Sequence, residues 1–199
     1  MLLPCIRTKA GHRAPTGWLA TCLMLASLCV SDARAAAETQ LAISNAQLSL
    51  DQGVYTLDAR ATIELPGGAR RAIEAGLTLH FKYEVVISQV RRYLPDDDVA
   101  TLVQSYELVF HALSERYLVR NLNTGEQRDF PTLQLAIDEL AELRNLPLLD
   151  AALLDPEATH DARLRVVLDM GNAPEALRWL LFWTDDWSAT SEWFRWTVR

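Results

Sequence analysis

Polar and apolar residues alternate along much of the chain from Ile43 onward. In residues 55–65, apolar side chains at the odd positions alternate with polar ones at the even positions. A period of two predicts a strand with one buried and one solvated face, as in an antiparallel sheet. Asp51, Gln52 and Gly53 form a turn signal just before it, so the segment and the apolar residues ahead of the turn predict a β-hairpin.

The same pattern predicts further strands. The odd residues of 77–87 form one apolar face, and the next strand, from Thr101, places Leu102, Tyr106, Leu108 and Phe110 on its core side. A second hairpin is predicted around the turn 123–125, with strands over 116–121 and 126–130. Two further strands are predicted over 161–170 and 192–198. Three short helices are predicted, over 66–75 with Gly76 as its left-handed cap, over 132–145, and from Asn172 to Trp183. The fold class is therefore α+β and β-dominated, an antiparallel sheet or sandwich of about seven to eight strands with three short helices.

The first 35 residues have the features of an export signal. A basic start is followed by an apolar run of fourteen residues, Gly17 to Val30, and by the small-x-small sequence Ala33-Arg34-Ala35. We expect cleavage near Ala35, a short linker over 36–41 and a single globular domain over 42–199. A spanning helix needs about twenty residues, so an uncleaved membrane anchor is the minor alternative, and lipid attachment at Cys29 is weaker because Leu28 precedes it.

Composition excludes several classes of function. All three cysteines, Cys5, Cys22 and Cys29, lie in the leader, so the exported part has no thiol for a disulfide, a metal or a nucleophile. The chain has 19 basic and 26 acidic residues, and the leader holds four of the basic ones. Nucleic acid is therefore not an expected partner, because phosphate binding needs clustered Lys and Arg.

Five tryptophans lie in the last 21 residues. Each buries about 150–250 Å² when packed, so we interpret most of them as core. The exceptions are Trp187, which follows Asp185 and Asp186, and Trp193, which points away from Phe194 and Trp196. The alternative interpretation is a binding groove lined by exposed aromatic side chains, formed by Trp187 and Trp193 with Asp185 and Asp186.

The strongest candidate for metal chemistry lies on the two long strands. If they pair with residue numbers summing to about 191, His80 faces His111 and Glu84 faces Glu107, and this set could hold a divalent ion. A solvated face with ordinary charges is the favoured interpretation, since directly opposed glutamates repel each other. No catalytic motif, phosphate loop or paired CxxC occurs, so we predict neither catalytic residues nor a cofactor, and no enzyme.

The export signal and four segments together resemble an uncharacterised proteobacterial exported family, domain of unknown function 4390. The segments are "ISNAQLSLDQGVYTLDARATIEL", "LTLHFKYEVVISQVRRYLPDD", "SYELVFHALSERYLVRNLNTGEQRDFPTLQLAIDEL" and "WSATSEWFRWTV". The resemblance implies a periplasmic setting and genes that often neighbour a sensor histidine kinase. The leading hypothesis is a non-catalytic periplasmic module that binds an envelope or membrane protein, such as that kinase. The alternatives are a small-molecule or lipid carrier, and a metal-dependent hydrolase.

Overall fold

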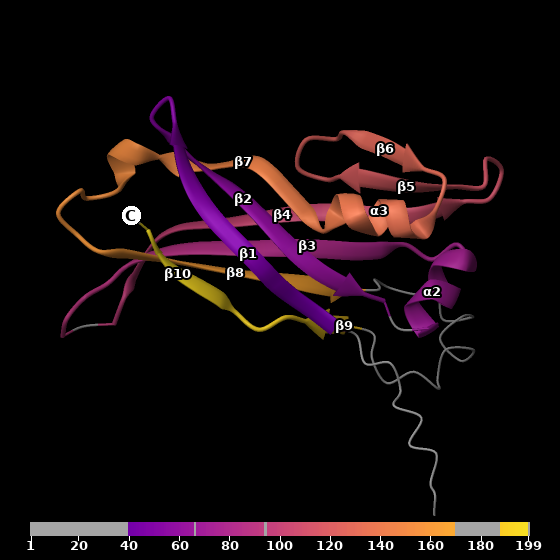
Figure 1. The fold of residues 1–199 in the computed structure, drawn as a ribbon, viewed down its shortest axis with the longest axis horizontal. Coiled ribbons are helices and arrows are strands. Elements are labelled where there is room, and N and C mark those ends of the chain that lie inside the picture. The colour runs from indigo at the N-terminus through magenta and orange to yellow at the C-terminus, as the bar shows by residue number, and fades with distance from the viewer. Residues whose placement is uncertain (1–39, 66, 94, 170–187, 199) are drawn as a thin grey trace, which may run out of the picture. The chain divides into compact units, whose positions relative to one another are not determined.

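The structure, a computed structural model, describes residues 40–65, 67–93, 95–169 and 188–198. This part of the chain forms two antiparallel sheets, with strand orders β1-β2-β7 and β10-β8-β3-β4-β5-β6, and β9 pairs with β8 (Figure 1). The fold is thus β-dominated, as predicted. The strands are β1 (Gln40–Asp51), β2 (Val54–Glu64), β3 (Leu79–Gln89), β4 (Asp97–His111), β5 (Arg116–Asn121), β6 (Gln127–Phe130), β7 (Glu142–Asp150), β8 (His160–Asp169), β9 (Ser188–Thr190) and β10 (Phe194–Val198).

The first hairpin confirms the turn prediction. Asp51 pairs with Val54, which leaves a two-residue loop of Gln52 and Gly53, both with positive φ, 49° and 87°. Positive φ at both loop residues is the requirement of a tight hairpin turn that matches strand twist. The predicted apolar face of β2 is buried, with Leu57 fully inaccessible. In β1 a bulge after Ile43 shifts the alternation, so that Ala46 rather than Asn45 faces the core.

The helix α2 (Gly67–Glu74) ends as the sequence predicts. Gly76 has φ +83°, and its N–H donates to Ile73 O at 2.8 Å while the Leu77 N–H donates to Ala72 O at 2.9 Å. These two bonds are those of a Schellman motif, which satisfies the last carbonyls of a helix. The chain then enters β3.

The strand β3 is central to the large sheet, because it pairs with β4 on one side and β8 on the other. Its predicted face is buried, and Leu79, Phe81, Tyr83, Val85 and Ile87 each have 1% or less of their surface exposed. The first four of these side chains pack in one cluster with Leu57 and other residues of the small sheet. Ile87 packs in a second cluster with Leu149, which also belongs to the small sheet. The two sheets therefore share a core, as in a sandwich.

The helix α3 (Leu133–Leu140) is shorter than predicted. Thr132 caps it as expected, accepting from the Leu135 N–H at 3.3 Å. The predicted extension to Asn145 is wrong, because the chain turns at Ala141 and enters β7, which pairs with β2. The helical pattern of 141–145 is overridden because pairing with β2 adds a third strand to the small sheet and buries Leu143 in the core.

The strand number is also higher than predicted, because β7 and the short β9 were not expected. Two α-helices and one 3-10 turn, η2 (Ala151–Leu153), lie in the described ranges. The third predicted helix, 172–183, lies outside them. None of the described helices is long and apolar enough to cross a membrane.

Candidate functional site

A cleft of about 380 Å³ lies where the small sheet ends and the large sheet continues. One wall is the edge strand β7, and the other is formed by β4, β5 and the β5–β6 hairpin, with the end of α3 closing it. The wider sheet extends past β7, so the inner face of β5 is covered by α3 rather than by another strand (Figure 1). The lining residues are Tyr106, Val119, Asn121, Thr124, Glu126, Arg128, Glu139, Leu140, Glu142, Leu143, Arg144, Asn145, Leu146 and Pro147.

The floor of the cleft is apolar and anchored by tyrosines. Tyr83 lies beneath it, fully buried, and donates its hydroxyl to Leu140 O at 2.6 Å. Tyr106 lines the cleft, with its ring edge-on to that of Tyr83 at 6.3 Å between centroids. Burial raises the pKa of Tyr106, and the nearby Glu139 carboxylate raises it further. Both phenols therefore remain neutral at physiological pH.

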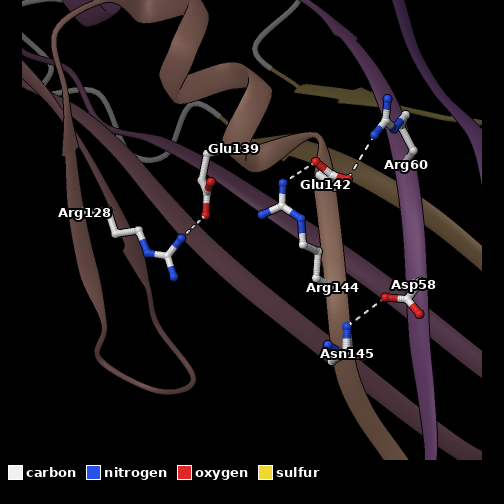
Figure 2. Close-up of polar contacts among 7 residues, drawn as sticks. All are labelled: Asp58, Arg60, Arg128, Glu139, Glu142, Arg144 and Asn145. Atoms are coloured by element: carbon white, nitrogen blue, oxygen red, sulfur yellow. Dashed lines mark hydrogen bonds and ion pairs between the residues drawn. The ribbon is translucent and has the colours of Figure 1, made fainter.

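An irregularity in β7 presents residues to the cleft. Leu57 pairs with Leu146 while Ala59 pairs with Leu143, so Arg144 and Asn145 form a bulge. Asn145 has φ 50°, which asparagine tolerates better than most residues. Its N–H donates to Asp58 Oδ1 at 3.0 Å, as Figure 2 shows. Bulges of this kind often redirect a side chain near a binding site.

Charged side chains of both signs form ion pairs along the cleft. Arg128 Nη1 lies 2.7 Å from Glu139 Oε1, which joins the hairpin to α3 (Figure 2). Glu142 accepts from Arg60 Nη2 at 2.9 Å through one oxygen and from Arg144 through the other. The hydrogen bonds from Arg144 and then Arg60 lower the pKa of Glu142, so it stays ionised. An ionised, doubly paired carboxylate is unsuited to act as a general acid.

The β5–β6 turn is fixed by Asn121. Its Oδ1 accepts from Gln104 Nε2 at 2.7 Å, from the Asn123 N–H at 2.9 Å and from the Thr124 N–H at 3.1 Å. Gln104 is buried, so this network connects the turn to the sheet interior. The rim that carries Thr124 and Glu126 is thus held in place by the fold.

The predicted register of the two long strands is wrong. His80 pairs with Glu107, with Nδ1 and Oε1 3.9 Å apart, and not with His111. Four residues separate Glu107 from His111 along β4, about 13 Å at strand spacing, too far for both histidines to bind one ion. His111 instead has Nδ1 2.9 Å from Ser114 Oγ.

Glu84 is likewise not opposite Glu107. It pairs with Val103 across the ladder, and its Oε2 accepts from Arg165 at 2.6 Å. The described residues contain no group of three or more His, Cys, Asp or Glu side chains placed to hold a metal ion. The four residues of the metal hypothesis therefore do not form one site.

In the described part of the aromatic tail, residues 193–196 alternate between the two faces as predicted, whereas Trp179 and Trp183, two of the tryptophans interpreted as core, lie outside the described residues. Phe194 and Trp196 pack against the core, whereas Trp193 lies on the opposite face, 4.4 Å from the Arg165 guanidinium and 5.3 Å from that of Arg163. Both guanidiniums also pair with carboxylates, Arg165 with Glu84 and Arg163 with Asp98. Trp193 is half-buried and does not line the cleft. Trp187, Asp185 and Asp186 lie outside the described residues, so the predicted groove stays a prediction.

Fold and site together describe an antiparallel β-sandwich protein with an open, ion-paired cleft beside an edge strand. The chain belongs to the family described as Domain of unknown function (DUF4390), which it matches over residues 38–197. No curated protein matches the sequence, and no solved structure matches it.

Proposed function

We propose that this chain is an exported, non-catalytic module of the cell envelope that binds a polypeptide segment of a membrane protein in the cleft beside β7. A sensor kinase is one such membrane protein. The observation that carries the proposal is the combination of an apolar floor with rim charges of both signs. Protein interfaces have this composition, an apolar centre within a polar rim.

The ion pairs at the rim of the cleft can open and be replaced by ion pairs with a bound partner. Arg128 and Arg144 line the cleft, and Arg60 pairs with the lining residue Glu142; all three side chains are more than half exposed. Exposed pairs contribute only about 0–1 kcal/mol to stability, so they open at little cost. A partner that offers its own carboxylates and cations can then pair with these groups without a large desolvation penalty.

A photo-crosslinking amino acid at Glu126, on the exposed rim, tests the proposal. We expect an adduct with one membrane protein in envelope extracts, and we expect Arg144→Glu to abolish it by reversing a rim charge. The matched control carries the crosslinker at Asp161, an exposed position of β8 that does not line the cleft. The proposal fails if neither position gives an adduct, or if both give the same one regardless of Arg144.

A small-molecule carrier is the second candidate, favoured by the cleft volume. The value of about 380 Å³ falls in the range of small-ligand pockets, about 300–1,000 Å³. Native mass spectrometry of the purified protein decides between the two. A bound small molecule that is lost in Leu146→Asp supports the carrier, whereas an unliganded mass together with the crosslink supports the partner module.

A further inference from the structure

The described fold has four sheet edges, formed by β1, by β7, by β6, and by β9 and β10, which both pair with β8. These edges differ in how they are protected. Edge strands expose unpaired N–H and C=O groups, and proteins usually block them with charges, proline, bulges or short length. The edge β7 has Pro147 and the bulge at Arg144, β6 is four residues long and carries Arg128 and Asp129, and β9 and β10 have three and five residues. Each of these edges thus has at least one protective feature.

The remaining edge, β1, has little protection beyond one bulge. It is 12 residues long, and it contains neither proline nor a charged residue from Gln40 to Leu50. Among the described residues it pairs only with β2. Its solvent-facing side chains from Ala42 to Leu50 are uncharged: Ala42, Ser44, Asn45, Gln47, Ser49 and Leu50. This edge is therefore a template for a further strand.

We propose that β1 pairs antiparallel with β1 of a second copy of this chain across a two-fold axis, which joins the two small sheets into one six-stranded sheet. A two-fold axis perpendicular to a strand places a second copy of that strand antiparallel to the first. Two copies of β1 can therefore pair through the same residues, as an isologous interface requires. The chain has a net charge of −7, so two copies repel each other over most surfaces. The uncharged edge of β1 allows close approach without that repulsion.

The strand order adds a geometric consequence. In the small sheet β1 and β7 lie at opposite edges, with β2 between them. The joined sheet has the order β7-β2-β1-β1-β2-β7, so each copy keeps its cleft beside β7 open at an outer edge. The dimer and the proposed function are thus independent, and either can fail alone.

Sedimentation velocity of protein purified after expression of the full chain tests the dimer over about a hundred-fold range of concentration. We expect a monomer–dimer equilibrium that is weakened about tenfold or more by Ala42→Lys and by Gln47→Lys, because each puts like charges on both strands of the junction. Thr62→Lys is the matched control. Thr62 is the exposed β2 partner of Ala42, so it places the same charge on the same face one strand away from the edge.

Circular dichroism of the three variants establishes that each remains folded. Amide exchange gives a second measure, since protection of β1 should rise with protein concentration while that of β2 stays constant. A monomer at every concentration overturns the proposal. So do equal effects of Ala42→Lys and Thr62→Lys, or open-ended oligomers in place of a dimer.

Discussion

The buried tyrosine beneath the cleft makes folding sensitive to alkaline pH. Burial raises the pKa of Tyr83 above its usual value of 10.0, and the neighbouring Tyr106 adds to the effect. Below pH 10 the phenol is neutral in both folded and unfolded chains, so it contributes no pH dependence. Above pH 10 the unfolded chain ionises first, and the free energy of unfolding falls by about 1.4 kcal/mol for each pH unit.

Urea denaturation of the wild type and of Tyr83→Phe at pH 8 and above pH 10 measures this effect. At pH 8 the variant should lose about 1 kcal/mol, because the hydrogen bond to Leu140 O is removed. Its further loss above pH 10 should be smaller than that of the wild type, although Tyr106 still contributes. Tyr93→Phe is the control, since Tyr93 is 88% exposed. If the free energy of unfolding fell equally with pH above pH 10 in the wild type and in Tyr83→Phe, the alkaline sensitivity would not come from Tyr83.

At the scale of the element, the end of α2 depends on one backbone conformation. A Cβ at Gly76 would meet no atom within 4 Å, so a substitution there acts through φ +83° alone. We expect Gly76→Ala to lower the free energy of unfolding by about 1–2 kcal/mol, and Gly76→Asn by less, because asparagine tolerates this region. Thermal unfolding ranks the three proteins. If Gly76→Ala and Gly76→Asn lowered the free energy of unfolding equally, the positive φ of Gly76 would not be the cause of the loss.

Elements and hairpins with local signals were predictable from the sequence, whereas the register of the two long strands and the pairing of β7 with β2 were not. The caps Thr132 and Gly76 and the turn at Gly53 are encoded by adjacent residues. The register of β3 and β4 is set by a bulge beside Ile87 and by the turn length, which alternation does not specify. The predicted register was off by four residues, an even number. Every side chain therefore fell on the correct face but opposite the wrong partner.

The cleft was not predicted because its residues come from separate elements. Residues 141–145 continue the helical pattern of α3, and only pairing with β2 makes them a strand. The bulge at Asn145 depends on the Asp58 side chain, 87 residues away in the chain. Pro147 was the available signal, since it both ends a helix and suits an edge strand.

At the scale of the molecule, the two sheets differ in width, and the site follows from that difference. Three strands cover only part of the larger sheet, and α3 contacts β5, β6 and β7 where the cover ends. The cleft lies between the strand β7 of the small sheet and the helix α3, which together cover this part of the large sheet. The shape of the cleft therefore depends on the packing of the shared core, which holds both of its walls in place.

That shared core should make both sheets unfold together. Leu57 of the small sheet and Leu164 of the large sheet are fully buried in one cluster. We expect Leu57→Ala and Leu164→Ala each to lower the free energy of unfolding by about 2–5 kcal/mol, in a single transition that tryptophan fluorescence and circular dichroism report at the same urea concentration. Leu50→Ala, at a position 58% exposed, should change stability by less than about 0.5 kcal/mol. If Leu57→Ala separated the two signals, the small sheet would unfold on its own, and the cleft wall formed by β7 would not be held by the large sheet.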